Sequence, residues 1–319
     1  MALETRYVPK LGRSVTRLGL GALPMGPLQR GLTVEEGARV VRAAVEGGVS
    51  FIDTATAYGT YEHVARGLFG WQGTVTVATK THARADGAAA REHIEMARRE
   101  LGRDVIDIML CHCARSLLTR EEWGPTLDAL LEAKAKGRIS LVGLSSHAVE
   151  GVRIAARHPD IDVVHPLINL TGMGIVDGTV DEMIAATAEA HDAGKFVYGM
   201  KALAGGNLVP RREEALQYAF GLDVLDTIAV GMVTPDEVEW NLRFAQSMAI
   251  PKELSERTAA HSKRLNILTF VCQGCGKCVD ACENAALSVV EGKAVVDVEQ
   301  CILCGYCAPH CPMFAIRMV

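Results

Sequence analysis

The chain has 319 residues, enough to bury a large core and to form one large domain with a small one beside it. Its formal net charge is −5 and it has no basic run, which argues against a nucleic-acid-binding function. The N-terminus lacks the apolar stretch of a secretion signal, and the longest uncharged segment, 163–176, is interrupted by His, Pro, Asn and Gly. We therefore expect a cytoplasmic protein that does not interact with a membrane.

The first 250 residues or so alternate between short apolar runs and segments of helical periodicity. Apolar runs rich in Val, Ile and Leu predict strands that are buried on both faces. The first helical segment opens with a capping box, Thr33 and Glu36, and ends at a glycine pair. The predicted strands are 18–22, 51–54, 75–79, 106–111, 140–144, 163–167, 196–200 and 227–230. The predicted helices are 33–48, 87–102, 126–137, 179–194 and 234–248.

This alternation predicts an α/β fold of the (β/α)8 TIM-barrel type over residues 1–262, because eight strand–helix units in about 250 residues match that barrel in number and size. The alternative is a doubly wound sheet. Segment 19–26, GLGALPMG, does not match the G-x-G-x-x-G fingerprint that such a dinucleotide-binding sheet carries. The barrel is the better interpretation.

Polar side chains follow three consecutive predicted strands of this barrel. Asp53 and Tyr58 follow the second strand, Lys80 the third and His112 the fourth. These residues should be neighbours, because the carboxyl ends of barrel strands form one face and carry the chemistry. A free phenol has a pKa near ~10, and an adjacent ammonium lowers it. Lys80, paired with Asp53, would thus make Tyr58 a better acid, and His112 would orient a substrate oxygen for carbonyl reduction.

These residues stand in a pattern that resembles the aldo-keto reductase family. Segment 53–59 matches the family's D-T-A-x-x-Y-G, and 107–112 matches its D-ϕ-x-L-x-H ending in the histidine. The resemblance covers roughly residues 5–250. It implies a reductase in which Tyr58 donates the proton, with NADP(H) or NAD(H) as cofactor and a small carbonyl or alcohol compound as substrate.

The same resemblance implies where a nicotinamide cofactor would bind. The serines after the fifth strand would contact the carboxamide, while a His replaces the family's Gln and a Met its stacking aromatic. Two positions that usually carry basic residues for a 2′-phosphate are Gly231 and Glu237 here. The choice between NADPH and NADH as the cofactor therefore stays open. Glu237 also has a structural explanation, a capping box with Thr234. The implied contacts are Ser145, Ser146, His165, Met200, Gly231, Thr234, Glu237 and Asn241.

Eight of the ten cysteines lie after residue 271, in two runs of C-x2-C-x2-C-x3-C that superpose with an offset of 29. This is the pattern of a bacterial two-cluster ferredoxin, in which the fourth cysteine of each run crosses to the other cluster. We predict two [4Fe-4S] clusters in a small α+β domain, 263–319. A zinc site would leave four thiolates unexplained. The predicted ligands are Cys272, Cys275, Cys278 and Cys311 for cluster one, and Cys301, Cys304, Cys307 and Cys282 for cluster two.

Two smaller features of the sequence concern the connector and a cysteine pair. Segment 251–265 predicts a polar helical connector between the two domains. Cys111 and Cys113 flank His112, but strand alternation turns them to the opposite face, which favours packing over chemistry.

Two functional hypotheses follow. In the first, the barrel is a working carbonyl reductase or alcohol dehydrogenase, and the tail either exchanges electrons with a redox protein such as a ferredoxin or a flavoprotein or supports the site. In the second, the chain is an electron-transfer or docking module whose barrel is mainly a scaffold. The complete set Asp53, Tyr58, Lys80 and His112 favours the first, because a scaffold needs none of it.

Overall fold

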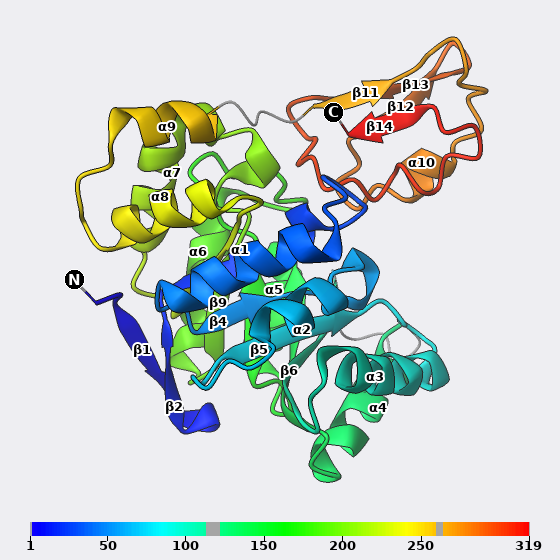
Figure 1. Cartoon of the computed structure of the whole chain (residues 1–319). Helices are drawn as coiled ribbons and strands as arrows, with labels where there is room; N and C mark the ends of the chain where they lie inside the picture. Colours follow the sequence, from blue (N-terminus) through cyan, green and yellow to red (C-terminus); the bar gives the residue numbers. More distant parts are fainter. Residues whose placement is uncertain (1, 113–121, 260–263, 319) are drawn as a thin grey trace.

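The computed structural model describes residues 2–112, 122–259 and 264–318. Eight parallel strands close a barrel in the order β10-β3-β4-β5-β6-β7-β8-β9. Figure 1 shows helices around these strands and the small C-terminal domain beside them. All eight predicted strands are confirmed, with ends shifted by at most two residues. They are β3 (Leu18–Gly21), β4 (Phe51–Asp53), β5 (Thr76–Thr81), β6 (Ile106–Cys111), β7 (Ile139–Ser146), β8 (Val163–Pro166), β9 (Phe196–Met200) and β10 (Thr227–Gly231).

Helices surround the barrel and cover the outer faces of its strands. The five predicted helices are present, and the first has the predicted capping box of Thr33 and Glu36. Three further helices, α2, α5 and α7, were not predicted. The eight are α1 (Val34–Glu46), α2 (Tyr61–Leu68), α3 (Gly87–Leu101), α4 (Gly124–Ala135), α5 (Val149–Arg157), α6 (Val180–Asp192), α7 (Arg212–Phe220) and α8 (Pro235–Ala245).

The connector contains α9 (Lys252–Ala259), which packs on α8. The indole Nε1 of Trp240 donates to Ser255 Oγ at 3.2 Å, and Arg257 pairs with Asp236. The predicted domain boundary at 262/263 lies outside the described residues, as does Cys113. Cys111 lies in the main hydrophobic core, as a packing residue should.

One end of the barrel is closed by an N-terminal hairpin of β1 (Thr5–Val8) and β2 (Arg13–Thr16). Val8 and Val15 of this hairpin pack with interior residues such as Phe51 into one apolar cluster, and Arg13 pairs with Asp107 near the start of β6. Because the hairpin covers this end of the barrel, we look for binding and chemistry at the carboxyl ends of the strands. In the described parts of the chain, no helix combines the length and apolar character that crossing a membrane requires.

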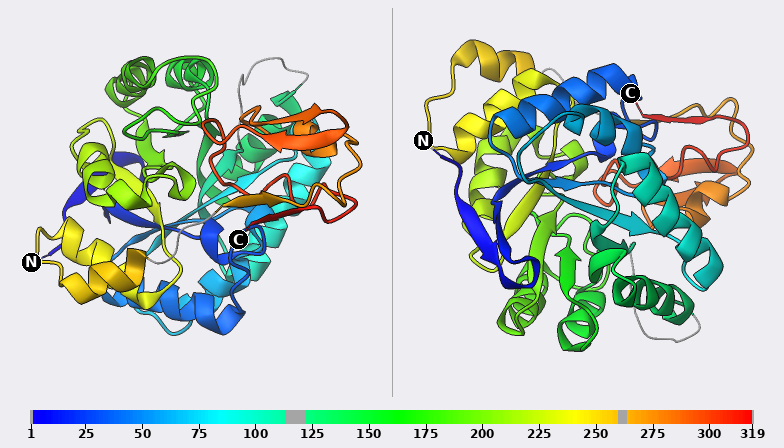
Figure 2. Two further views of the ribbon diagram at one scale, coloured as in Figure 1. Left: turned by 90° about the horizontal axis from the view of Figure 1, so that it is seen from above. Right: turned by 60° about the horizontal axis from the view of Figure 1, so that its bottom comes forward.

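The C-terminal domain lies at that open end, opposite the hairpin (Figure 2). It is the predicted small α+β unit, built from two antiparallel strand pairs, β11–β14 and β12–β13, and one short helix. Its elements are β11 (Leu265–Ile267), α10 (Lys277–Asp280), β12 (Leu287–Val290), β13 (Lys293–Val296) and β14 (Ile316–Met318).

The internal repeat of this domain is present in the backbone as well as in the cysteines. Three pairs of residues 29 apart share a positive φ, which is uncommon outside glycine. The backbone N–H of Ala286 donates to Cys282 Sγ at 3.2 Å, and Ala315 donates to Cys311 Sγ at 3.3 Å. The pairs are Gly274 and Leu303, Gly276 and Gly305, and Ala285 and Phe314.

Candidate active site

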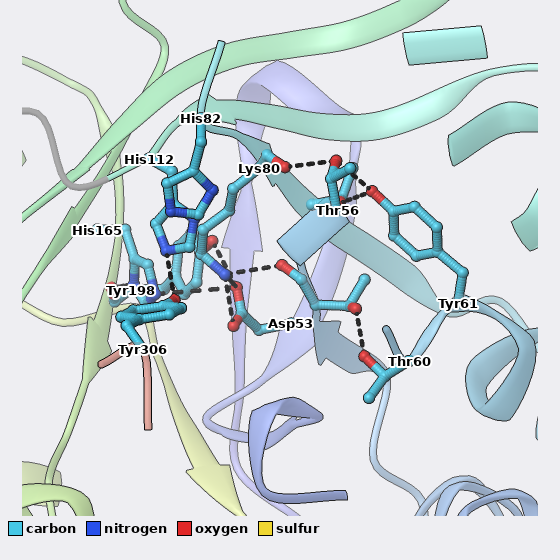
Figure 3. Close-up of polar contacts among 12 residues, drawn as sticks. Asp53, Thr56, Thr60, Tyr61, Lys80, His82, His112, His165, Tyr198 and Tyr306 are labelled. Atoms are coloured by element: carbon cyan, nitrogen blue, oxygen red, sulfur yellow. Dashed lines mark hydrogen bonds and ion pairs between the residues drawn. The ribbon is translucent and has the colours of Figure 1, made fainter. Parts of the chain in front are cut away.

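A buried ion pair lies at the centre of the open end of the barrel. Asp53 ends β4 and Lys80 lies near the end of β5, two adjacent strands. The Nζ of Lys80 donates to both carboxylate oxygens of Asp53 at 2.6 and 2.7 Å, and to the Thr54 carbonyl at 2.8 Å (Figure 3). Burial raises the pKa of Asp53, while the charge and hydrogen bonds of Lys80 oppose that rise. Three donors with three acceptors fix the position of this ammonium.

Tyr58 lies beside this pair, in the 3₁₀ turn η3 (Thr56–Tyr58) that follows β4. The Thr56 hydroxyl donates to the Lys80 carbonyl at 2.9 Å, which ties the turn to β5. The Lys80 ammonium lies 4.8 Å from the centre of the Tyr58 ring. The ring of Tyr58 therefore lies beside a buried cation, and the effect of that cation on the phenol stays a prediction.

Two residues of β8 and β9, on the other side of the barrel from β4, lie next to the carboxylate. Tyr198 on β9 donates its hydroxyl to Asp53 Oδ1 at 3.0 Å. His165 on β8 stacks on the Tyr198 ring with centroids 3.7 Å apart, and its Nδ1–H donates to the Tyr198 carbonyl at 2.6 Å. Burial lowers the pKa of His165 well below its usual value, so the imidazole is neutral and its Nε2 is an acceptor.

His112 follows β6 and lies edge-on to Tyr58, with ring centroids 5.6 Å apart. Its Nδ1 lies 3.2 Å from Nδ1 of His82, two residues beyond Lys80. Burial, followed by the neighbouring positive charges, lowers the pKa of His82 to about 4 and that of His112 well below its usual value. Both imidazoles are neutral, so one Nδ1 donates to the other. When His82 is that donor, the His112 proton is on Nε2 and faces the site.

The C-terminal domain also contributes a side chain to the site. The hydroxyl of Tyr306 lies 3.3 Å from His112 Nε2, although 194 residues separate them (Figure 3). Its ring belongs to an apolar cluster with Leu23, Ala55 and Tyr58. The loop that joins two predicted cluster ligands therefore contributes a side chain to the barrel site.

A cleft leads from these residues to the N-terminus of α8. Asp53 and Tyr58 line one end of it, and Glu237 and Asn241 line the other. Three cations line its walls, namely Arg30, Lys201 and Arg212. An elongated anionic molecule would fit this cleft with one end beside Tyr58.

The predicted cofactor contacts divide between the cleft and its surroundings. His165, Met200, Gly231, Glu237 and Asn241 line it. Ser145, Ser146 and Thr234 are not among the lining residues, and the two serines are fully buried. Their contact with a nicotinamide stays a prediction.

The capping box predicted at α8 is half formed. Thr234 Oγ1 accepts from the backbone N–H of Glu237 at 3.1 Å, as expected. The Glu237 carboxylate, however, accepts from the N–H of Val233 at 2.7 Å rather than from that of Thr234. The loop before α8 bends so that the preceding N–H is the one within reach.

The eight cysteines of the tail form the two predicted sets. A small cavity is lined by Cys272, Cys275, Cys278 and Cys311. In the other set, burial, then the charges of Cys304, Cys282 and Cys301, raise the pKa of Cys307 to about 12. Among the described residues, no three His, Cys, Asp or Glu side chains converge on a point suited to a single metal ion. Thiols spaced around a cavity suit a larger cluster with a ligand at each corner.

The barrel is closed by the hairpin at one end and has a buried Asp–Lys pair, a tyrosine and neutral imidazoles at the other, where barrel enzymes have their active sites. The comparisons with known proteins identify its class. Residues 17–218 match the Aldo/keto reductase family and residues 271–316 match the 4Fe-4S dicluster domain. The chain belongs to the aldo/keto reductase family and is an oxidoreductase.

The relatives are distant. Aldo-keto reductase YhdN of Bacillus subtilis is 26% identical over 70% of this chain and 68% of its own length. L-galactose dehydrogenase of Arabidopsis thaliana is 23% identical over 84% of this chain and 97% of its own.

Solved structures show the same fold. The putative aldo-keto reductase PA4992 of Pseudomonas aeruginosa superposes with a TM-score of 0.64 at 24% identity, covering 76% of this chain and 94% of that one. The Bombyx mori aldo-keto reductase AKR2E4 in complex with NADP gives 0.60 at 15% identity, covering 82% and 93%.

Three residues of the site were missed from the sequence: Tyr198, His82 and Tyr306. Tyr198 lies within a predicted strand, where strand alternation alone could have placed it inside the barrel. His82 lies two residues after Lys80, and the same alternation indicates the same side. Tyr306 could have been found only by comparing equivalent positions of the two cysteine repeats, because its contact joins two domains.

Proposed function

We propose that the barrel interconverts a small carbonyl compound and its alcohol by hydride transfer with a nicotinamide cofactor. The observation that carries this proposal is the Lys80–Asp53 pair beside Tyr58, at the end of a cleft that is also lined by residues of α8. A nicotinamide bound there would supply or accept the hydride. A scaffold has no use for a buried group made of Asp53, Tyr58, Lys80 and His112. This argues against the hypothesis that the chain is mainly a docking module.

Several features of the cleft suit a dinucleotide. Arg30, Lys201 and Arg212 would neutralise a pyrophosphate. The amide Oδ1 of Asn241 is buried and has no hydrogen-bond partner among the described residues, so it could accept from an adenine amino group. His165 Nε2, an acceptor, could receive a carboxamide N–H.

In this mechanism the residues of the chain handle the proton and the orientation. Tyr58 donates its proton to the carbonyl oxygen as the alcohol forms and takes it back in the reverse direction. The Lys80 ammonium stabilises the phenolate, and Asp53 holds the ammonium in place. His112 donates from Nε2 to the same oxygen, provided that His82 sets its tautomer.

Removing the hydroxyl of Tyr58 tests this assignment. Tyr58→Phe should lower kcat/KM for carbonyl reduction by about 100-fold or more, the usual scale of a general acid, while nicotinamide still binds. Tyr7→Phe, in the hairpin at the opposite end of the barrel, is the matched control and should keep wild-type turnover. Turnover of Tyr58→Phe at the wild-type rate would remove Tyr58 from the mechanism.

For the tail, we infer two [4Fe-4S] clusters that exchange electrons with a redox protein, or dock one. Cys275 of the first set is exposed, as are Phe270 and Phe314, which flank that set in the sequence. The second set lies against the barrel, with Cys304 packed near Met200. A ferredoxin or flavoprotein would therefore approach cluster one.

A further inference from the structure

The two cluster loops, 272–278 and 301–307, are related by the 29-residue repeat but differ in the residues between their cysteines. The first loop has exposed Gln273 and Lys277 and a half-buried glycine, and the second has buried or half-buried side chains that are mainly apolar. Leu303 even adopts a φ of 49° where the first loop has Gly274, a conformation that costs a non-glycine residue about 1 kcal/mol or more. The paired positions are Gln273 and Ile302, Gly274 and Leu303, and Lys277 and Tyr306.

The second loop is anchored to the barrel through its own backbone. Asn207 Nδ2 donates to the Cys301 carbonyl at 2.9 Å, and Gln29 Nε2 donates to the Leu303 carbonyl at 3.3 Å. The side chain of Ile302 is buried against Leu167 and Met200.

The barrel is shaped to receive this loop. At Gly205, with φ +70°, an added Cβ would lie 1.7 Å from the Ile302 carbonyl oxygen, so only glycine fits there. Two hydrogen bonds, the apolar packing of Ile302 and its close approach to Gly205 together hold the loop over the open end of the barrel.

This anchoring places Tyr306 over the reacting groups. Its hydroxyl lies 3.3 Å from His112 Nε2, its ring contacts the cluster that contains Tyr58, and Tyr58 and His112 are both at most 5% exposed. We propose that Tyr306 is a specificity-determining residue of the carbonyl site, which restricts the substrate to compact carbonyl compounds. The inference rests on the proposed carbonyl chemistry.

The physical reason is steric. A carbonyl oxygen that bonds both Tyr58 and His112 must enter the space beside the Tyr306 hydroxyl. A small substituent on the carbonyl carbon fits beneath the ring, and a large one collides with it. Because close-packed loops resist displacement, discrimination should follow substrate bulk rather than polarity.

The test compares two aldehydes that differ in bulk, propanal and 2-naphthaldehyde, using anaerobic holoprotein and either NADH or NADPH. Tyr306→Ala should raise the ratio of kcat/KM for 2-naphthaldehyde over propanal by about 10-fold or more, the scale at which pocket shape discriminates. Tyr306→Phe keeps the ring and should keep the ratio. Lys277→Ala, the same position in the exposed loop, is the matched control and should leave the ratio unchanged.

A second readout needs no turnover. Diethyl pyrocarbonate reacts with neutral imidazole, so carbethoxylation of His112, mapped by mass spectrometry, reports how well it is covered. The rate should rise at least several-fold in Tyr306→Ala and stay unchanged in Lys277→Ala. Cluster absorbance checks each variant. Should the alanine variant lose its clusters, Tyr306→Leu keeps apolar packing and serves the same comparison.

The outcomes separate the two proposals. An unchanged aldehyde ratio in a cluster-loaded Tyr306→Ala overturns the inference while leaving carbonyl reduction intact. Failure of the wild type to reduce any aldehyde refutes the proposed function, and the specificity inference falls with it. In that case the His112 modification rates still decide whether Tyr306 covers the site.

Discussion

A matched pair of glycines allows the contact between the two domains to be measured. Gly276 and Gly305 occupy the same position in the two cluster loops, with φ of +78° and +86°. Alanine at either position adopts a left-handed backbone conformation at a cost of about 1 kcal/mol. An added Cβ at Gly305 would also lie 2.1 Å from the Leu28 carbonyl oxygen, whereas at Gly276 it would meet none of the described atoms within 4 Å.

The difference between the two variants therefore isolates the contact with the barrel. Overpacking of this kind costs about 1–3 kcal/mol. We expect Gly305→Ala to unfold roughly 2 to 12 °C below Gly276→Ala, using about 2–4 °C per kcal/mol for a chain of this size. The assay is thermal unfolding of anaerobic holoprotein, followed by cluster absorbance at one fixed scan rate. Equal midpoints would show that the loop does not press on Leu28 and would refute the docked arrangement.

Three further predictions concern protonation, cofactor choice and electron flow. Burial lowers the pKa of His82 to about 4, below the value near ~6.5 of an unfolded histidine, so the fold should lose stability as pH falls from about 6.5 toward 4. Denaturation midpoints of wild type and His82→Gln across that range check this, and parallel curves would contradict it. Because Gly231 and Glu237 offer no cation to a 2′-phosphate, steady-state kinetics should show no strong discrimination against NADH; a large preference for NADPH would mean that another cation reaches the phosphate. If the clusters have ferredoxin-like potentials near ~−400 mV, NADH or NADPH alone should give no reduced-cluster EPR signal while dithionite should, and a rapid signal with nicotinamide alone would reveal an internal electron splitter.

Much of the barrel could be predicted because its signal is local. Strands buried on both faces must be apolar along their whole length, and the reacting residues must lie at the carboxyl ends of those strands. Asp53, Lys80 and His112 could therefore be placed at one end of the barrel from the order of residues in the chain.

The helices that were missed share a physical cause. In α2, α5 and α7, the N-cap residue itself makes no side-chain hydrogen bond to the helix, although the distant Asp177 accepts from the first two N–H groups of α5. By contrast, four of the five predicted helices, α1, α3, α6 and α8, have caps from Thr33, Asp86, Thr179 and Thr234, whereas α4 begins without one. A helix that begins without a capping side chain, and is stabilised by packing, leaves little trace in its first residues.

The contribution of the tail to the site could not be predicted for a different reason. The repeat identifies the cysteines, but nothing in it says which of the two loops faces the barrel. The apolar replacements at Ile302, Leu303 and Tyr306 become informative only once the second loop is seen against Met200 and His112. Comparing equivalent positions of the two repeats would have been the available signal.

The most direct test of the account follows the hydrogen itself. Carbonyl reduction is run anaerobically in ordinary water with NADH or NADPH stereospecifically deuterated at C4, once with each of the two labelled forms, and the alcohol is analysed by mass spectrometry. Direct hydride transfer predicts one deuterium on the former carbonyl carbon with one of the two forms and none with the other. An alcohol without deuterium from either form would mean that electrons reach the substrate separately from the hydrogen, by way of the clusters, and would contradict hydride transfer in the barrel.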